Sequence, residues 1–207
     1  MIRRGSTLQA VCFDSSALRK RGLNVVLVGG SAATYYSRGA YQSDDIDFVA
    51  RFDVDSRREA EVVEVMTDLG YELNGNTFEH TGGNRFTVEF PKGPAAVSGD
   101  VLSVFHTVEA NGKAMDIVTP TDCVRDRLAH YFFWNDRTAL RAAIVVAQAH
   151  RSKVDMGLVK AWSAREGQSA KFKDFLVGLH AGRQQAKSRF PRRNPRPSGS
   201  TAARFKR

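Results

Sequence analysis

The chain has 207 residues, of which 42% are hydrophobic and 26% are charged, enough for one substantial core or a core with a small helical subdomain. No stretch approaches the roughly 18 consecutive apolar residues of a membrane span, and no apolar segment follows the N-terminal basic residues, so neither a membrane protein nor a secretory signal is indicated. The net charge of +9 is uneven. Nine of the 31 basic residues lie from Arg183 onward, where no acidic residue occurs, so the first 182 residues hold 22 basic and 22 acidic side chains. Only the tail therefore favours a nucleic-acid partner.

In chain order, the first half of the sequence predicts alternating helices and strands. Ser6 can cap a helix that runs to about Arg21 and ends at Gly22. The apolar run 24–28 predicts a strand buried on both faces. The other elements expected here are a short helix over 31–38, a strand over 45–50, a helix from the capping-box spacing at 56–59 to Gly70, and an alternating strand over 85–90 that stops at Pro91.

The second half predicts a hairpin followed by helices. Two strands over 101–109 and 113–118 are joined by the Asn111-Gly112 turn signal. A capping box at 119–122, with proline at the first helical position, then begins a helical part with helices over 121–133, 137–150, 154–165 and 169–185. The sequence thus predicts an α/β domain over 1–120, a helical subdomain over 121–185 and a disordered basic tail over 186–207.

The two cysteines, Cys12 and Cys123, are isolated in the sequence. Without a second cysteine near either, a disulfide or metal pair is not favoured. They are expected to be small, reduced core residues of a cytoplasmic protein.

A glycine turn follows the first predicted strand. Gly29 and Gly30 allow the backbone to approach a ligand closely, and Ser31 then stands at a helix N-terminus. Unpaired N–H groups and the helix dipole favour an anion at such a position. The alternative is a plain strand-to-helix turn in which glycine serves packing alone.

Two carboxylates lie on one face of the next predicted strand. Side chains alternate along a strand, so Asp45 and Asp47 point the same way with Cα atoms roughly 6–7 Å apart, while Ile46 and Phe48 point into the core. Like charges on one face repel unless a cation lies between them, and hard divalent cations prefer carboxylate oxygens. The alternative is a solvated strand edge or an Asx-type turn at residues 43–45. The glycine turn, with its anion-binding helix N-terminus, and the acidic pair together favour a site for a metal ion and a triphosphate.

A third carboxylate is expected on a later strand. Glu89 shares a strand face with Arg85 and Thr87 and is the better candidate, although an antiparallel strand can simply expose such a face to water. Asp116 is its rival, and it is better interpreted as a structural aspartate just before a helix.

With these residues in place, the sequence resembles the polymerase-β-type nucleotidyltransferase superfamily. The resemblance covers roughly residues 20–135. It rests on Gly29-Gly30-Ser31, on Asp45-Ile46-Asp47 and on the later carboxylate. Residues 29–50, with Ser43 just before the acidic pair, are similar to the minimal nucleotidyltransferases, including the toxin-like branch of abortive-infection and toxin–antitoxin systems.

The resemblance implies a fold, a reaction and a cofactor. The fold would be a small mixed β-sheet flanked by helices, an α/β (α+β) nucleotidyltransferase fold, followed by a helical C-terminal part. Gly29, Gly30 and Ser31 would bind the triphosphate of an NTP substrate. The metal-binding and catalytic residues would be Asp45, Asp47 and Glu89, which would hold one or two Mg²⁺ ions that activate an acceptor hydroxyl and steady the leaving pyrophosphate.

Two arginines lie on the predicted helix over 121–133, the first helix of the helical part. Arg125 and Arg127 are two positions apart and cannot share one helix face, so one of them could reach a phosphate. The alternative, which we favour, is ion pairing with Asp122 or Asp126.

Three functional hypotheses follow. The first is a Mg²⁺-dependent nucleotidyltransferase that moves an NMP onto a hydroxyl of RNA such as tRNA, of a protein or of a small molecule, with a toxin-like role and an antitoxin-like protein partner. The second is a non-catalytic relative that binds nucleotide or RNA. The third is a partner-binding protein that uses its basic tail. The tail can attract RNA by counterion release, and Phe190 and Phe205 can stack on bases, or it can merely solubilise the chain.

Overall fold

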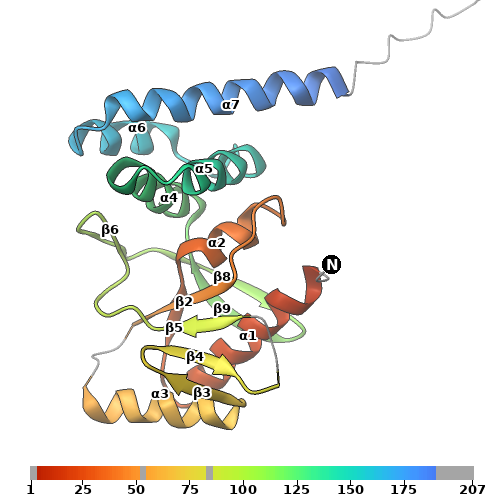
Figure 1. Ribbon diagram of the computed structural model, residues 1–207, viewed down its shortest axis with the longest axis vertical. Coiled ribbons are helices and arrows are strands. Elements are labelled where there is room, and N and C mark those ends of the chain that lie inside the picture. Colours follow the sequence, from red (N-terminus) through yellow and green to blue (C-terminus); the bar gives the residue numbers. More distant parts are fainter. Residues whose placement is uncertain (1–3, 52–54, 83–85, 190–207) are drawn as a thin grey trace, which may run out of the picture.

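The computed structural model describes residues 4–51, 55–82 and 86–189, which form a mixed β-sheet with helices packed around it (Figure 1). The strands of this sheet are β1 (Val25–Leu27), β2 (Asp45–Ala50), β3 (Tyr71–Asn74), β4 (Thr77–His80), β5 (Thr87–Glu89), β8 (Phe105–Ala110) and β9 (Lys113–Val118). They lie side by side in the order β3-β4-β5-β2-β1-β9-β8. A separate antiparallel pair consists of β6 (Ala96–Val97) and β7 (Asp100–Val101).

The helices are divided between the sheet and a layer stacked on it. Three helices lie among the strands in the sequence: α1 (Arg4–Lys20), α2 (Gly29–Tyr36) and α3 (Ser56–Asp68). The other four follow the last strand: α4 (Pro120–Trp134), α5 (Arg137–Ala149), α6 (Met156–Arg165) and α7 (Ser169–Arg189). Figure 1 shows α4 to α7 stacked above α2, with α3 below β3 and β4. Helix α2 contacts β2 on one side and α4 and α5 on the other, so it joins the two layers.

The centre of the sheet is buried as the sequence predicts. All three residues of β1 are buried, and the strand lies in the sheet between β2 and β9. In β2 the alternation is visible side chain by side chain: Ile46 and Phe48 are fully buried, whereas Asp45 is exposed. Strand β2 runs antiparallel to β1 and parallel to β5. Apolar side chains on the inner positions thus fix the central strands, and the alternate positions 45 and 47 of β2 carry polar groups, whereas Val49 on the same side is buried.

Several predicted boundaries differ from the observed ones. Helix α2 begins at Gly29, two residues before the predicted start, because Gly29 takes a φ of +64° and turns the chain directly into the helix. The predicted capping box at 56–59 is wrong: Asp55 is the cap, and its side chain accepts a hydrogen bond from the backbone N–H of Arg58. The predicted strand 101–109 begins only at Phe105.

The hairpin of β3 and β4 was not predicted. Its strands are short, they turn at Gly75, and only Tyr71 in β3 is buried. With one buried side chain in four, β3 lacks the alternation by which a strand is recognised in sequence. The hairpin is stabilised instead by pairing of β4 with β5, which brings Phe78 beside Val88.

The helical part agrees closely with the sequence. Thr119 accepts a hydrogen bond from the Asp122 N–H and Pro120 is the first residue of α4, as predicted. Helix α7 continues to Arg189, beyond the predicted end at 185, and the rest of the predicted disordered tail lies outside the described residues. The division into domains at 120 and 185 stays a prediction. Both cysteines are buried and free, as expected. Within the described ranges, no helix combines the length and apolar character needed to cross a membrane.

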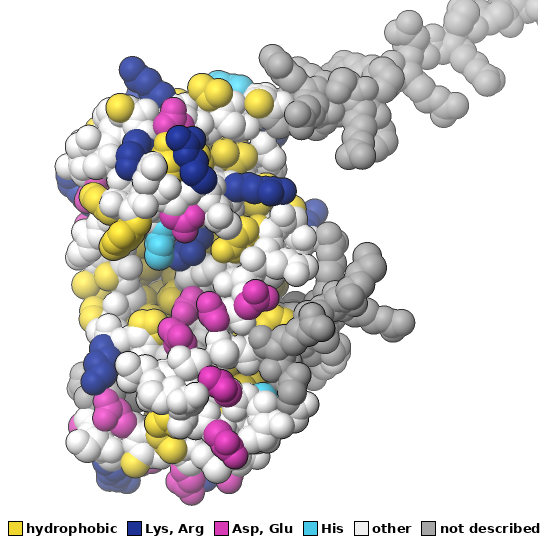
Figure 2. Space-filling view, viewed as in Figure 1, with side chains coloured by type: hydrophobic (Ala, Val, Ile, Leu, Met, Phe, Trp, Pro, Cys, Tyr) yellow, Lys and Arg dark blue, Asp and Glu magenta, His cyan; other side chains and the backbone are white. Residues whose placement is uncertain are grey.

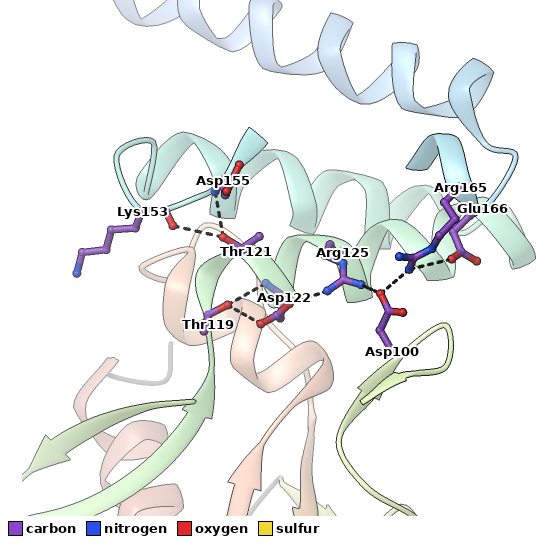
Figure 3. A network of polar contacts seen from close by, with 9 residues as sticks. All are labelled: Asp100, Thr119, Thr121, Asp122, Arg125, Lys153, Asp155, Arg165 and Glu166. Carbon is purple, nitrogen blue, oxygen red and sulfur yellow. Dashed lines mark hydrogen bonds and ion pairs between the residues drawn. The ribbon is translucent and has the colours of Figure 1, made fainter. Parts of the chain in front are cut away.

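A polar network joins the β6–β7 pair to the helical layer (Figure 3). The Asp100 carboxylate accepts from the guanidinium groups of Arg125 on α4 and Arg165 on α6. Arg125 is buried and also donates to Asp122 at 2.9 Å. Nearby, the Thr121 hydroxyl accepts from the backbone N–H of Asp155 at 3.0 Å. One carboxylate therefore links three elements that are distant in sequence.

We expect Asp100→Asn to lower the free energy of unfolding by about 1 kcal/mol, or roughly 2–4 °C in Tm, because the two arginines lose a charged partner while Arg125 keeps Asp122. Thermal unfolding at low and high salt measures this. The Asp100 carboxylate is partly exposed, so the loss should shrink as salt rises. Glu109→Gln, a charge loss at another exposed position, is the matched control. An equal effect of both substitutions would contradict the linking role.

Candidate functional site

The glycine turn is shaped by two side chains that press against it. A Cβ atom on Gly29 would lie 2.2 Å from Oδ2 of Asp47, and a Cβ on Gly30 would lie 2.5 Å from Oγ of Ser43. Neither position has room for any side chain unless its neighbour moves. The first N–H groups of α2 have no intrahelical acceptor, since every helix begins with such groups. The turn therefore presents a helix N-terminus directly beside an acidic side chain.

The Ser31 hydroxyl is engaged by the backbone. Ser31 is only 6% exposed, and its hydroxyl donates to the carbonyl oxygen of Asp45. This contact ties the start of α2 to the start of β2. Any contribution of Ser31 to anion binding in this arrangement comes from its backbone N–H rather than from its side chain.

The structure brings the three predicted carboxylates onto one face of two neighbouring strands. In the parallel pairing of β2 with β5, Asp45 lies opposite Thr87 and Asp47 lies opposite Glu89. Asp45 accepts from the Thr87 hydroxyl at 2.6 Å, and Glu89 accepts from the Thr77 hydroxyl at 3.0 Å. Adjacent strands are about 4.8 Å apart, so the pairing makes Asp47 and Glu89 immediate neighbours. We call these three residues the acidic cluster.

Asp116 is not part of the acidic cluster. It accepts hydrogen bonds from Arg51 at 2.9 Å and from Thr107 at 2.8 Å, and it forms an ion pair with Arg19 at 3.0 Å. Arg51 follows the last residue of β2, whereas Asp45 and Asp47 lie in the first half of that strand. The ion pairs at the opposite end of β2 agree with the interpretation of Asp116 as a structural aspartate.

Asp47 carries the strongest electrostatic perturbation of the cluster. Burial raises the pKa of its carboxyl from 3.8 to about 6; the Arg127 guanidinium lowers this pKa, and Glu89, Asp45 and Asp126 raise it. Negative charge thus exceeds positive charge around a half-buried carboxylate, the condition in which a bound cation is most favourable.

The raised pKa of Asp47 predicts a pH-dependent stability. The folded protein holds a proton that the unfolded chain releases above pH 4, so the free energy of unfolding falls as pH rises from about 4 to about 6. Asp47→Asn should abolish the decrease in the free energy of unfolding that Asp47 causes between pH 4 and 6. The variant should therefore be more stable than the wild type by about 2 kcal/mol at pH 7, and equally stable near pH 4.

Urea unfolding from pH 4 to 7 tests this expectation. Asp14, whose pKa burial also raises to about 6, adds the same trend to both proteins and cancels in the comparison. Asp44→Asn, at the exposed position next to the cluster, is the matched control. A stability difference that does not change with pH would contradict the assignment.

Helix α4 contributes a buried cation to the site. Arg127 is 8% exposed, and its Nε and one terminal nitrogen donate to Oδ2 of Asp126 at 2.9 and 2.7 Å. Its charge acts on Asp47. The favoured ion pairing of both arginines is confirmed, because Arg125 pairs with Asp122 and Arg127 with Asp126. The sequence did not reveal that the second pair stands beside the acidic cluster.

Two further residues belong to the site, although the sequence indicated no role for Tyr41 and only an ion pair for Asp126. The Tyr41 hydroxyl oxygen would lie 3.4 Å from a Cβ on Gly30. Asp126 reaches the site only through the placement of α4. Tyr41 lies in the loop between α2 and β2, where no periodicity marks a functional side chain.

The residues fit a divalent cation in charge and in ligand chemistry. Their carboxylates are hard oxygen donors, and they repel one another. In the described parts of the chain, no group of three His, Cys, Asp or Glu side chains is arranged to hold a metal ion. Two of the three carboxylates are instead turned to threonine hydroxyls of the neighbouring strands. Each of these bonds uses one carboxylate oxygen, so the second oxygen of Asp45 and of Glu89 would remain for the ion.

No protein-family model matches the sequence, and no curated protein matches it. Among solved structures, an antigenic nucleotidyltransferase-like protein from Paracoccidioides brasiliensis is similar in fold, with a TM-score of 0.53 and 16% identity over 84% of this chain and 91% of that one. The solution structure of the antibiotic-resistance factor ANT(2'')-Ia has a TM-score of 0.46 and 15% identity, over 87% of this chain and 99% of that one. The crystal structure of ANT(2'')-Ia in complex with adenylyl-2''-tobramycin has a TM-score of 0.47 and 16% identity, over 77% of this chain and 97% of that one. The seven-stranded sheet with its flanking helices is a nucleotidyltransferase fold, as expected.

Proposed function

We propose that this protein is a magnesium-dependent nucleotidyltransferase that transfers a nucleoside monophosphate from an NTP to a hydroxyl acceptor. One observation carries the proposal. The half-buried carboxylate of Asp47 lies both against Gly29 at the N-terminus of α2 and opposite Glu89 on the neighbouring strand. A phosphate-binding helix end and an acidic cluster therefore share one small region of the fold, as transfer of a phosphorylated group demands.

The chain's own residues divide the work. Backbone N–H groups of Gly29, Gly30 and Ser31 would bind the triphosphate, helped by the dipole of α2. Arg127, held in its ion pair with Asp126, would offset part of the negative charge around Asp47. Asp45, Asp47 and Glu89 would hold Mg²⁺, which supplies Lewis-acid activation of the acceptor hydroxyl and charge neutralisation of the phosphates.

The direct test is transfer of label from each of the four α-³²P-labelled NTPs, with and without Mg²⁺, to total RNA, to protein and to small hydroxyl compounds. Mg²⁺-dependent labelling of any acceptor class supports the proposal. Nucleotide binding without transfer would instead favour the non-catalytic hypothesis. Neither binding nor transfer, with an acidic protein that co-purifies, would favour the partner-binding hypothesis.

Three finer predictions rest on the sequence alone and stand as alternatives: RNA as one of the possible acceptors, a toxin-like role and an antitoxin-like partner. The toxin-like role rests on the resemblance of residues 29–50 and stays a prediction. The RNA acceptor rests on the basic tail, whose residues from 190 onward lie outside the described part of the chain.

Truncation after Arg189 tests the tail without shortening α7. We expect RNA affinity at low salt to fall at least about tenfold and its salt dependence to become shallower, because the six basic residues beyond 189 are lost. NTP affinity should not change. Filter binding across a salt series measures both, and RNA affinity equal to that of the full chain would contradict this function of the tail.

A further inference from the structure

A pocket of about 370 Å³ lies between the β6–β7 pair and helix α4. Figure 2 shows hydrophobic side chains around a hollow on this face of the molecule, below a histidine. We call it the α4 pocket. Its lining residues are Ala96, Val97, Ser98, Asp126, Ala129, His130, Phe133 and Trp134.

The α4 pocket is connected to the acidic cluster through one stripe of α4. His130 follows Asp126 by four residues, and Phe133 and Trp134 follow His130 by three and four. Because such spacings place side chains on the same side of a helix, these four lining residues form one stripe. At one end, Asp126 is bonded to Arg127 and its charge acts on Asp47. Two turns further on, the stripe ends in the two aromatic rings. The pocket therefore extends along α4 from the exposed rings to Asp126, the lining residue whose charge acts on Asp47.

The rings are unusually exposed for their size. Trp134 is 71% exposed and Phe133 is 47% exposed, while the other tryptophan, Trp162, is 2% exposed. Exposed aromatic side chains beside a pocket are a common feature of binding sites, since each offers a large apolar face at low conformational cost. Their position at the last turn of α4 leaves both rings open to a partner.

The charges of the α4 pocket do not suit a phosphate. No Lys or Arg is among its lining residues, and its one carboxylate, on Asp126, forms an ion pair with Arg127. Burial, followed by the charge of Arg127, lowers the pKa of His130, so the ring is neutral at pH 7. The lining thus offers aromatic faces, a neutral imidazole, a hydroxyl on Ser98 and a paired carboxylate, a set that favours an uncharged polar ring over a polyanion.

We propose that the α4 pocket binds the acceptor of the transfer reaction, a small hydroxylated ring compound without phosphate, with its ring against Trp134 and Phe133. The proposal rests on the proposed function and specifies its acceptor. The volume suits one sugar or one nucleoside. The acceptor hydroxyl oxygen forms a bond to the α-phosphorus of the NTP, and the bond from that phosphorus to the bridging oxygen breaks. Pyrophosphate leaves with the electron pair, and the hydroxyl proton is released to solvent.

Tryptophan fluorescence of the full chain tests the pocket without requiring catalysis. The probes are methyl β-D-glucopyranoside as a free sugar, uridine as a nucleoside and an eight-residue uridine oligonucleotide as a polyanion. A saturable change of fluorescence with the glucoside indicates that the pocket binds a sugar, and one with uridine indicates that it binds a nucleoside. We expect affinity for the binding probe to fall at least about tenfold in Trp134→Ala and to be retained in Trp134→Phe. Phe13→Ala, at an exposed aromatic position on α1, is the matched control.

The outcomes separate this inference from the proposed function. Trp134-dependent binding of a ring probe supports the α4 pocket even if no NTP is ever turned over. NTP transfer whose acceptor KM is unchanged in Trp134→Ala overturns the pocket and leaves the proposed function intact. Tighter binding of the oligonucleotide than of uridine through Trp134 overturns the exclusion of phosphate, and no saturable change with any probe overturns the inference as a whole.

Discussion

Nucleotidyl transfer by Asp47→Asn should be at least about 10³-fold slower than by the wild type, because the acidic cluster would lose a ligand of the Mg²⁺ that stabilises negative charge developing on the phosphates. Asp47 is the member of the cluster that contacts the glycine turn and also lies opposite Glu89, so its loss affects both halves of the site. Label transfer under single-turnover conditions measures the effect. The loss should be in kcat rather than in NTP affinity alone.

The controls distinguish catalysis from folding. Asp47→Asn should be as stable as the wild type or more stable at pH 7, since a carboxylate whose pKa is raised by burial and by neighbouring charges is removed. Asp44→Asn should keep full activity. In the wild type, Mg²⁺ should raise Tm by binding only the folded state, and Asp47→Asn should lose most of that shift. Activity of Asp47→Asn within tenfold of the wild type would overturn the assigned role.

Gly29→Ala should abolish detectable transfer and lower the free energy of unfolding by about 2–4 kcal/mol, which combines a strained backbone with a steric overlap. Its φ of +64° disfavours any L side chain, and the added Cβ would overlap with Oδ2 of Asp47 at 2.2 Å. Either the carboxylate or the start of α2 must shift. Both are parts of the proposed site, so activity and stability should fall together.

Gly22→Ala is the matched control for Gly29→Ala. Gly22 has a similar φ of +73°, but no heavy atom lies within 4 Å of where its Cβ would stand. It should therefore show only the backbone cost, about 1 kcal/mol, with transfer activity unchanged. Urea unfolding and label transfer on both variants separate the two contributions. Equal losses of activity would show that the contact with Asp47 is not what the turn provides.

The secondary structure near the site was largely predictable because its signals are local. The apolar run into β1, the alternation of β2 and the cap at Thr119 each depend on residues within one or two turns of one another. The β3–β4 hairpin escaped prediction because only Tyr71 of β3 is buried. The hairpin is stabilised by pairing of β4 with β5, and no local pattern in a short polar strand predicts such pairing.

The composition of the site was only partly predictable. The spacing of Asp45 and Asp47 puts both carboxylates on one strand face whatever the rest of the fold. The sequence could not decide whether Glu89 or Asp116 joins this pair, because the answer depends on which strands pair with β2 and in which register. Likewise, the sequence allowed Arg127 to bind either a carboxylate or a phosphate, and only the packing of α4 against α2 brings its ion pair to Asp47.

By itself, the sequence determined a glycine turn after a buried strand, an acidic pair on the following strand and a helical second half, since periodicity, caps and turn residues act over a few positions. The tertiary structure alone decided that Glu89 stands beside Asp47, that the Ser31 hydroxyl is bonded to a backbone carbonyl, and that one stripe of α4 connects the acidic cluster to the exposed ring of Trp134. The physical reason is that strand register and helix packing are set by burial of the whole core, in which residues more than 40 positions apart become neighbours.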